Sequence, residues 1–341
     1  MLQAIVIDDR RKTAWDAFVQ RHPGTIAWHL YDWSNVLRTY HGTTFYPIAA
    51  MEGDEVRGIL PLYRVRTLRT GVALVSIPYV VAGGIVADDE EAEKLVLEEA
   101  IRISQGMGTP PIALKQYGHR VAGELRTDEG YYNQELSLSA GTAEIWKNLP
   151  AALRESIESI PKAELQLDYP STDVAAFHLA LSRHQRAGGV PSPSRRWIEL
   201  LLGSKLYQMA LLRSGGRVVA GTMLKIFRQT ASFPYTCVTE RGEAGVHWAR
   251  RFYWEMIERL ATDGFQIVHS GRIPYNEKVP AYRLGWGGQR REYYYQYVGL
   301  QGKTESGSKR GRSRAVVEAV WRRMPLTLAN LISPPLLRQY P

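Results

Sequence analysis

Residues 207–227 read YQMALLRSGGRVVAGTMLKIF, two apolar runs separated by the short turn sequence SGGR. Apolar runs on either side of paired glycines are typical of a β-hairpin, because glycine readily adopts the positive φ angles of tight turns. A third apolar run (231–238), a helical pattern (246–261) and a short apolar run (265–269) follow. This part of the chain therefore predicts a hairpin, a strand, a long helix and a further strand.

The same order of elements occurs earlier in the chain. Residues 46–50 and 56–65 form a predicted hairpin around the turn EGDEV, followed by a strand (72–77), an amphipathic helix (89–105) and a strand (112–115). The offset of about 160 residues is far longer than a solenoid repeat, so it indicates a duplicated domain. Further helices are predicted at 142–159, 173–186 and 195–202, and a strand at 133–139.

These patterns predict an α/β (α+β) fold of tandem duplicated domains, with mixed β-sheets flanked by helices. We expect a first domain at residues 1–160, a second at residues 161–300, and a basic linker with a C-terminal helix at residues 301–341.

Composition sets the broad class of protein. The 341 residues are 45% hydrophobic and 23% charged, which is ordinary for a globular protein. The net charge of +9 favours a polyanionic partner such as a nucleic acid, a nucleotide cofactor or an anionic membrane. No apolar window approaches the length of a membrane span and no signal peptide is evident, so we expect a cytoplasmic protein.

The sequence lacks the residues that several kinds of chemistry require. The single cysteine, Cys237, excludes a disulfide framework, and its apolar surroundings in sequence predict an inert thiol. The eight histidines show no ligand spacing, so we expect no metal site. HExxH, GxSxG and Walker A motifs are absent, which argues against metalloprotease, esterase and P-loop activities.

Residues 269–288, HSGRIPYNEKVPAYRLGWGG, form the most unusual stretch of the chain. They follow an apolar strand pattern, combine glycines with two arginines, and precede a run of tyrosines at 293–297. Loops after buried strands often carry ligand contacts in α/β proteins. A surface loop with solvated arginines explains the same composition equally well.

The hairpins, the mixed sheet and a glycine-containing strand before a long helix follow the plan of GNAT acyltransferases. In that fold, a splayed strand pair and a helix N-terminus receive the pyrophosphate of the cofactor. The corresponding stretch here, residues 241–246, has Ala244 where the first glycine of the acetyl-CoA loop belongs. The sequence therefore does not support an intact loop for coenzyme A.

Seven motifs occur in a shared order along nearly the whole chain. They are HLYDW (29–33), GILPL (58–62), LVSIPYVVAGG (74–84), HQRAG (184–188), GR (271–272), YRLGWG (282–287) and WRRMPLTLAN (321–330). On these motifs the chain resembles the Fem-type transferases of the GNAT superfamily, specifically the FemAB-like proteins associated with exosortase (PEP-CTERM) and exopolysaccharide systems.

The resemblance implies an N-acyl or aminoacyl transferase with acyl-CoA or aminoacyl-tRNA as donor and no metal. Its acceptor would be an amine of a cell-envelope or exopolysaccharide-related molecule. The alternatives are a transferase that depends on acyl-CoA alone, and a catalytically degenerate scaffold that only binds. We expect a monomer, with tRNA as a candidate partner.

The chain departs from the family pattern at three places. At residues 154–162, where the family has a basic helix, this chain gains two acidic residues. His269 stands where the family has an aspartate, and Arg283 stands where it has a lysine. Arginine stabilises an oxyanion as lysine does, but it does not act as a base because it keeps its proton.

Aminolysis needs a deprotonated amine, a stabilised oxyanion and aligned substrates. Our catalytic candidates are His184 as the base, because imidazole titrates near neutrality, and Arg283 at the oxyanion or a phosphate. Arg272 is a candidate for binding acceptor phosphate or carboxylate in a bidentate manner. Surface hydrogen bonding of His184 and structural salt bridges for the arginines are the alternatives. Further substrate-binding candidates, which packing roles could also explain, are Tyr79, Tyr282, Ser76, Gly83, Gly84, Arg186 and Trp286.

The segment GKTESGSKRGRSRAVVEAVWRRMP (302–325) reads as a basic linker running into a helix. Val316, Val317, Val320 and Trp321 lie on the apolar side of that helix. It is predicted either to pack on the second domain or to attach the protein to the anionic surface of the inner membrane, which would suit a lipid-linked acceptor.

Overall fold

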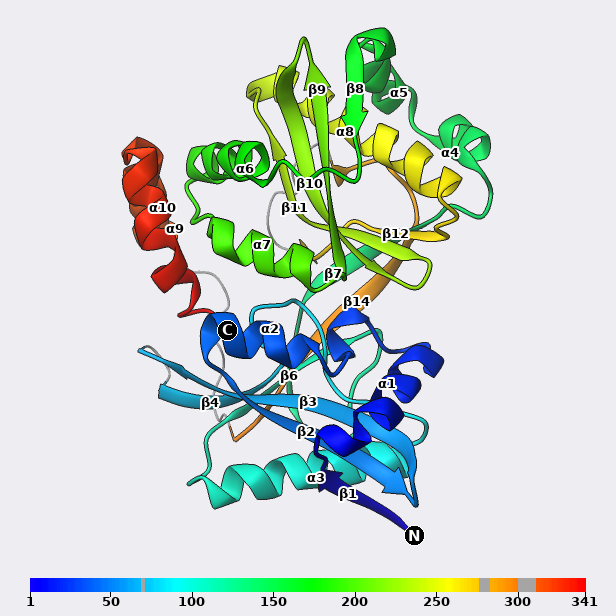
Figure 1. The fold of residues 1–341 in the computed structure, drawn as a ribbon, viewed down its shortest axis with the longest axis vertical. Helices are drawn as coiled ribbons and strands as arrows, with labels where there is room; N and C mark the ends of the chain where they lie inside the picture. Colours follow the sequence, from blue (N-terminus) through cyan, green and yellow to red (C-terminus); the bar gives the residue numbers. More distant parts are fainter. Residues whose placement is uncertain (69–70, 276–282, 300–310) are drawn as a thin grey trace. The chain divides into compact units, whose positions relative to one another are not determined.

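The computed structural model describes residues 1–68, 71–275, 283–299 and 311–341. The chain divides into two compact units, each with its own set of strands and helices (Figure 1). Unit 1 contains residues 1–132, 291–304 and 338–341, and unit 2 contains residues 133–290 and 305–337.

Unit 1 is built on a mixed sheet between two layers of helices. Its strands, in spatial order, are β1 (Leu2–Val6), β2 (Thr44–Glu52), β3 (Glu55–Thr67), β4 (Gly71–Ser76), β6 (Ile112–Tyr117) and β14 (Gln289–Val298). Strands β4 and β6 are parallel, whereas β1–β2, β2–β3, β3–β4 and β6–β14 are antiparallel pairs. The short strand β5 (Val86–Ala87) pairs with β3, and β14 lies next to β7 (Arg126–Ser137).

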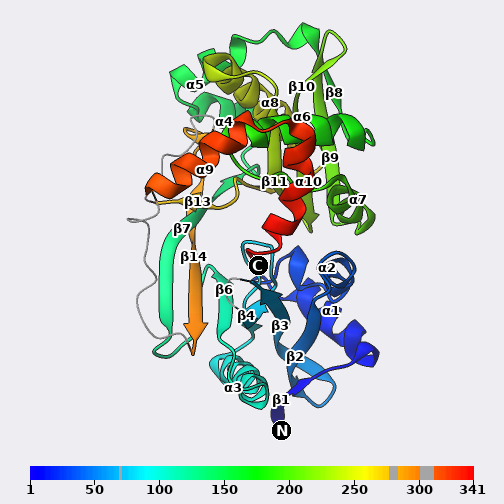
Figure 2. The same cartoon turned by 90° about the vertical axis from the view of Figure 1, so that its left-hand side faces the viewer.

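Helices cover both faces of this sheet (Figure 2). Helix α3 (Glu90–Gly106) buries Ala92, Val96 and Ala100 against Leu60 and Leu62 of β3. Helices α1 (Lys12–Arg21) and α2 (Trp33–His41) cover the other face, and the short 3-10 helices η1 (Asp9–Arg11) and η2 (Ala27–His29) flank α1. Alternation of apolar side chains along β2 and β3 supplies both faces with a core.

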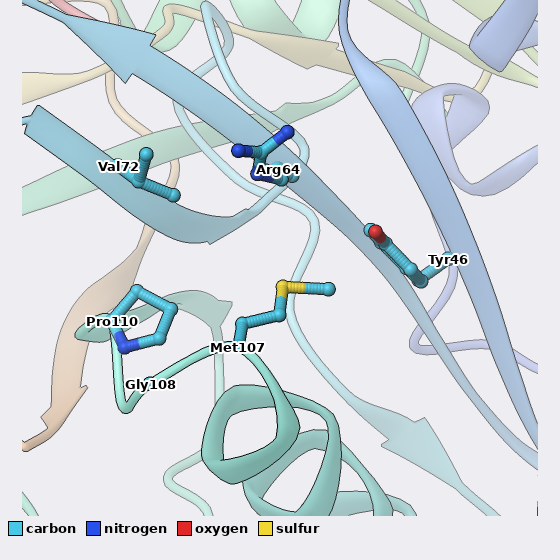
Figure 3. Close-up of a pocket in the computed structure, with 6 residues that line it drawn as sticks. All are labelled: Tyr46, Arg64, Val72, Met107, Gly108 and Pro110. Atoms are coloured by element: carbon cyan, nitrogen blue, oxygen red, sulfur yellow. The ribbon is translucent and has the colours of Figure 1, made fainter.

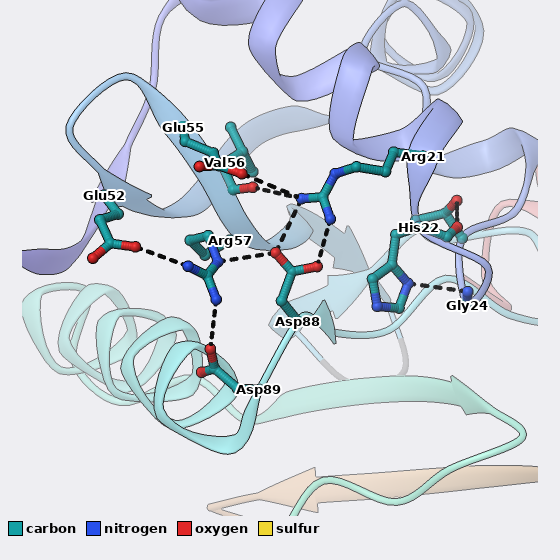
Figure 4. A network of polar contacts seen from close by, with 10 residues as sticks. Arg21, His22, Gly24, Glu52, Glu55, Val56, Arg57, Asp88 and Asp89 are labelled. Atoms are coloured by element: carbon teal, nitrogen blue, oxygen red, sulfur yellow. Dashed lines mark hydrogen bonds and ion pairs between the residues drawn. The ribbon is translucent and has the colours of Figure 1, made fainter.

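An ion-pair network holds the start of α3 against the hairpin of unit 1 (Figure 4). Asp88 accepts hydrogen bonds from Arg21 Nη1 and Arg57 Nε, each at 3.0 Å. Asp89 caps α3 by accepting from the backbone N–H of Ala92 at 2.8 Å. The network therefore ties α1, β3 and α3 together at one end of the sheet.

Unit 2 repeats this plan. Its strands, in spatial order, are the second half of β7, β12 (Ile267–His269), β11 (Thr230–Val238), β10 (Arg217–Phe227), β9 (Tyr207–Ser214) and β8 (Leu165–Asp168). Strands β11 and β12 are parallel, and the pairs β7–β12, β10–β11, β9–β10 and β8–β9 are antiparallel. The short strand β13 (Ile273–Pro274) also pairs with β7.

The helices of unit 2 again lie on both faces of the sheet. They are α4 (Thr142–Asn148), α5 (Ala151–Glu158), η3 (Lys162–Glu164), α6 (Val174–Gly188), α7 (Arg195–Gly203), α8 (Gly242–Thr262), α9 (Gly311–Arg323) and α10 (Leu326–Leu337). Helix α8 packs on one face with Phe252 and Ile257 in its core, whereas α6 and α7 cover the opposite face (Figure 1). Gly221 of β10 lies on the face of the sheet that α6 covers, because a Cβ atom at this position would lie 3.1 Å from the side chain of Phe177 of α6.

The duplication predicted from the sequence is confirmed, since both units contain a hairpin, a third strand, a long helix and a parallel fourth strand. The units differ from the predicted boundaries at 160 and 300. Strand β7 follows β6 in the chain, yet its second half completes the sheet of unit 2. Strand β14 follows the strands of unit 2, yet residues 291–298 belong to unit 1. Because each unit includes residues from distant parts of the chain, neither unit is one continuous segment.

One predicted helix is wrong in detail. Residues 142–159 form two helices, α4 and α5, with Leu149 and Pro150 between them. Proline has no backbone N–H to donate within a helix, so the chain begins a new helix after Pro150. The strand predicted at 133–139 begins earlier, at Arg126.

Candidate functional site

The two parallel strands of unit 2 separate near their C-terminal ends. The last registered pair joins Ser232 of β11 to His269 of β12, although β11 continues to Val238. On its other side, β11 shifts register against β10 between Met223 and Lys225, as a β-bulge does. Ligands of α/β proteins bind at the C-terminal ends of parallel strands, so this divergence is a candidate site.

Four polar side chains from four strands lie in one row beside this point. Register pairs Lys225 with Ser232, Ser232 with His269, and His269 with Glu135, so all four side chains share one face of the sheet. We call Lys225, Ser232, His269 and Glu135 the polar row. It lies on the face covered by α6 and α7, because Lys225 is four residues along β10 from Gly221.

The polar row contains groups that can exchange protons. His269 Nε2 lies 3.4 Å from Glu135 Oε1, with both side chains largely buried. A carboxylate beside an imidazole orients the ring and stabilises its protonated form. Burial lowers the pKa of Lys225 to about 7, so its amine exists in both charged and neutral forms near neutral pH.

The loop of residues 283–288 encloses a small cavity on the opposite face, beneath α8. The cavity, of about 20 Å³, is lined by Gln134, Leu136, Tyr253, Ile257, Val268, Ser270, Arg283, Trp286 and Gly287. The rings of Trp286 and Tyr253 pack with centroids 5.7 Å apart. Arg283 Nη1 donates to the carbonyl of Arg272 at 3.2 Å, which joins the two predicted arginines.

Glycine is required where this loop meets β7. Gly288 has a φ of +94°, and a Cβ atom there would lie 2.5 Å from the carbonyl oxygen of Glu135. The loop therefore packs backbone against backbone beside Glu135. The structure thus brings Arg283, Trp286 and the backbone of Arg272 together, while the side chain of Arg272 is exposed. Tyr282, another predicted site residue, lies outside the described residues.

The predicted base His184 lies elsewhere in unit 2. Its Nδ1 is 3.2 Å from the carbonyl oxygen of Val238, the last residue of β11, and burial lowers its pKa. Because α6 and α8 cover opposite faces of the sheet, His184 and Arg283 approach it from opposite sides. Arg186, also on α6, donates from Nη1 to the carbonyl of Met324 at 2.9 Å, a contact that fixes the end of α9.

With this geometry in place, comparison with known proteins identifies part of the chain. A family model described as an acetyltransferase (GNAT) domain matches residues 153–279. These residues are therefore similar to a GNAT domain. They include the polar row apart from Glu135, the divergence of β11 from β12, and the start of α8. The protein is accordingly an acyltransferase with a GNAT/Fem-like fold.

Solved structures share the fold over most of the chain at low sequence identity. FemX matches with a TM-score of 0.70 at 11% identity, covering 86% of this chain and 96% of FemX. A C-terminal domain from Agrobacterium fabrum, provisionally described as a lysylphosphatidylglycerol synthetase, matches with a TM-score of 0.56 at 14% identity over 91% and 96% of the two chains. A tandem GNAT protein from the clavulanic acid biosynthesis pathway matches with a TM-score of 0.54 at 12% identity over 89% and 100%. No curated protein matches the sequence significantly.

In unit 1, the equivalent divergence of parallel strands is closed by the chain itself. Ser76 Oγ accepts from the backbone N–H of Lys115 at 2.8 Å, and the N–H of Gly83 donates to the carbonyl of Lys115 at 2.9 Å. Lys115 Nζ donates to the carbonyl of Val80 at 2.9 Å, and Gly84 packs against Gln116. The predicted substrate residues Ser76, Gly83 and Gly84 therefore hold the loop 77–85 in place.

The loop lengths explain this difference between the units. Residues 77–89 connect β4 to α3, whereas residues 239–241 connect β11 to α8. A three-residue connection is too short to fold back over the strand ends as the loop of unit 1 does. Tyr79, also predicted to bind substrate, has a φ of +64° and stacks on His41 with ring centroids 3.5 Å apart.

Unit 1 contains an open cleft of about 470 Å³ between β2, β3, β4 and the end of α3 (Figure 3). It is lined by Tyr46, Arg64, Val72, Met107, Gly108 and Pro110. Arg64 offers a cation and Tyr46 a phenol, but the lining includes no carboxylate or imidazole. The residues that line this cleft therefore include no group that takes up a proton near neutral pH.

Three further findings concern metal ligands, Cys237 and membrane-spanning helices. Within them, no group of three or more histidine, cysteine, aspartate or glutamate side chains could hold a metal ion. Cys237 is buried, and burial raises its pKa to about 12, so its thiol is a poor nucleophile as predicted. None of the helices in the described ranges is long and apolar enough to cross a bilayer.

The sequence interpretation missed the polar row. Lys225 lies in an apolar strand pattern, where an isolated lysine looks like an edge residue, and Glu135 lies in a strand predicted without a partner. A search for titratable residues inside predicted strands would have found Lys225 and Glu135. Only the strand register places them beside His269.

Proposed function

We propose that the protein transfers an acyl or aminoacyl group from an activated donor to an amine, with the reaction taking place at the divergence of β11 and β12. The observation that carries the proposal is the polar row beside this divergence, whose members other than Glu135 lie inside the matched GNAT domain. Unit 1 has the same strands but closes their divergence with its own loop, which supports unit 2 as the site of transfer.

Transfer to an amine requires removal of a proton as the nitrogen attacks the acyl carbon. In our proposal His269, held by Glu135 at 3.4 Å, takes this proton. Lys225 lies two strands away in the same row, and its lowered pKa leaves part of its amine neutral near neutral pH, so that it can accept a proton. This assignment differs from the sequence prediction of His184, whose Nδ1 contacts the backbone of Val238.

Arg283 and Arg272 have a binding role in this proposal. Their loop lies on the α8 face beside the cavity, across the sheet from the polar row. Arginine grips phosphate or carboxylate through two parallel N–H donors. We propose that the two arginines hold an anionic group of the acceptor or of the donor.

The start of α8 is the place where a donor phosphate would bind in a GNAT fold. Gly242 has a φ of +63°, and a Cβ atom on Gly245 would lie 2.5 Å from the carbonyl oxygen of Glu240, so the turn is tight. The side chain of Arg241, the N-cap residue, makes no capping hydrogen bond. Glu243 adds a negative charge in the first turn, which disfavours a pyrophosphate. The shape of this turn suits a phosphate group of the donor, whereas its charge does not. Acyl-CoA and aminoacyl-tRNA are therefore both candidates for the donor.

The acceptor proposal rests on similarity. The motif resemblance favours an amine of a cell-envelope or exopolysaccharide precursor. FemX and the Agrobacterium domain described as a lysylphosphatidylglycerol synthetase share the fold, and the second name supports an aminoacyl group and a lipid-linked acceptor as one candidate pairing.

Thermal unfolding in the presence of each donor tests the proposal. A donor that binds the folded protein raises its melting temperature by mass action. Stabilisation by CoA thioesters and not by charged tRNA selects acyl-CoA, and the reverse selects aminoacyl-tRNA. If neither donor shifts the melting temperature, the protein is a degenerate scaffold and the transferase proposal is wrong.

A matched pair of histidine variants tests the assignment of the base once a donor is known. His269→Asn removes the proton acceptor of the polar row, whereas His119→Asn alters a second His–Glu pair, 3.1 Å from Glu93 in unit 1. We expect His269→Asn to slow transfer by about 100-fold and His119→Asn to leave it unchanged. Equal rates for both variants would exclude His269 as the base.

A further inference from the structure

The C-terminal helices of unit 2 present an unusual surface. Helix α10 has the sequence LTLANLISPPLL, which contains no charged residue, although the helix lies at the surface. Leu331 is 73% exposed, Leu328 45% and Leu336 41%, and on α9 Val317 and Val320 are 61% and 56% exposed. We call these five residues the apolar strip. Soluble proteins rarely gather so many large apolar side chains on neighbouring helices without a partner.

The orientation of α10 is fixed by its small residues. Ala329 and Ser333 are buried against unit 2, where α10 packs on α6 (Figures 1 and 2). The backbone N–H of Ser192 donates to Ser333 Oγ at 3.1 Å, and Ser333 Oγ donates to the carbonyl of Ala329 at 2.6 Å. The leucines therefore face outward because the small side chains occupy the contact with α6.

Helix α9 is anchored in a similar way. Trp321 is buried, and Glu318 packs against Gly189, where a Cβ atom would lie 2.8 Å from that of Glu318. The sequence placed Val317, Val320 and Trp321 together on one apolar side of this helix, but the structure buries Trp321 and leaves both valines exposed. The packed side of α9 is instead formed around Trp321 and Glu318.

Two arginines at the end of α9 lie next to the apolar strip in sequence. Arg323 is exposed, and Arg322 is half exposed while pairing with Glu318 at 3.2 Å. The sequence from 303 to 323 contains seven basic residues and two acidic ones, Glu305 and Glu318. Exposed leucines beside arginines, with few acids, are the chemical pattern of a helix that lies in the interface of an anionic membrane.

We propose that the apolar strip and the adjacent arginines bind the surface of a membrane rich in anionic lipid. Helix α10 would lie in the plane of the interface, with Leu328 and Leu331 among the acyl chains and the arginines at the headgroups. Twelve helical residues extend about 18 Å, which is shorter than a bilayer core of about 30 Å, so the helix does not span it. The proposal goes beyond acyl transfer and holds whether or not the protein is a transferase.

Co-flotation of the full chain with lipid vesicles tests the proposal. Wild-type protein should float with vesicles of equal parts phosphatidylglycerol and phosphatidylcholine, and more weakly with phosphatidylcholine alone or in high salt. The double variant Leu328→Glu/Leu331→Glu should reduce the bound fraction by about tenfold or more. Both positions are exposed, so thermal unfolding should match wild type and show that the fold is kept.

Leu179→Glu is the matched control, because Leu179 is 43% exposed on α6 of the same unit and lies outside the apolar strip. It should float like wild type. The proposal is overturned if wild type does not float, if the double variant floats equally well, or if Leu179→Glu loses binding to the same extent. It is also overturned if light scattering shows a dimer that the double variant converts to monomer, with no vesicle binding by wild type.

Discussion

Gly84 lies directly against the side chain of Gln116 in unit 1, so that a Cβ atom at position 84 would be 1.6 Å from Gln116 Oε1. We expect Gly84→Ala to lower the free energy of unfolding by about 1–3 kcal/mol, because Gln116 is buried and cannot move freely. Urea denaturation measures this change. In a Gln116→Ala background the clash is absent, so the added cost of Gly84→Ala should fall by about 1 kcal/mol or more. An unchanged cost would show that Gln116 is not the obstacle.

Asp88 in the network of Figure 4 should make stability depend on pH. Burial alone would raise the pKa of Asp88, but hydrogen bonds from Arg21 and Arg57 outweigh burial and lower it. A carboxylate with a lowered folded pKa stabilises the protein above its unfolded pKa, and this stability is lost as pH falls through the folded pKa. Asp88→Asn should therefore lower the free energy of unfolding by about 1–3 kcal/mol at neutral pH. The difference from wild type should shrink below about pH 4, and a difference that stays constant would contradict the ion-pair explanation.

Most of the fold was predictable from sequence because its signals are local. Apolar alternation and the SGGR and EGDEV turns predicted both hairpins, and the third strands and long helices followed from periodicity. Strand exchange was not predictable, because β7 and β14 pair with strands far away in sequence and their partners are set by the tertiary fold. The same reason explains why the two units differ from the predicted boundaries at residues 160 and 300.

The candidate site was predictable only in part. Arg283 and Trp286 stood out because glycines and aromatics surround them in sequence, and the structure places both around one cavity. Ser76, Gly83 and Gly84 also stood out, but their glycine signal reflects close packing on Lys115 and Gln116. The polar row depends on strand register between residues far apart in sequence, which composition and spacing do not reveal.

Lys225 should make stability depend on pH in the same direction as Asp88, but in a higher pH window. Burial lowers its pKa from the ordinary 10.5 to about 7, so between these values the unfolded chain binds a proton that the folded chain releases. Stability should therefore rise with pH across this window, by at most about 1.4 kcal/mol per pH unit. Lys225→Met keeps most of the length of the side chain and removes the charge, so it should stabilise the protein more at about pH 7 than at about pH 10. Urea denaturation of both proteins at the two pH values measures this difference.

Lys94→Met provides the control for this measurement, because the Lys94 side chain is 75% exposed. Its effect on stability should be small and similar at both pH values. A benefit of Lys225→Met that does not change with pH would mean that Lys225 keeps an ordinary pKa, and the proton-transfer role proposed for it would then lose its basis.

Arg283 is the residue of the sequence stretch 269–288 that we propose to bind substrate. It lines the cavity with Trp286 and donates to the carbonyl of Arg272, so its guanidinium is positioned by the loop itself. We expect Arg283→Ala to lower kcat/KM for transfer by about 100-fold while the melting temperature stays close to wild type. Arg283→Lys should recover part of the loss if the role is a single charge, and none if two parallel N–H donors are needed. Arg217→Ala, at an exposed residue of the β9–β10 turn, should leave kcat/KM unchanged. Turnover of Arg283→Ala equal to that of Arg217→Ala would remove Arg283 from the site.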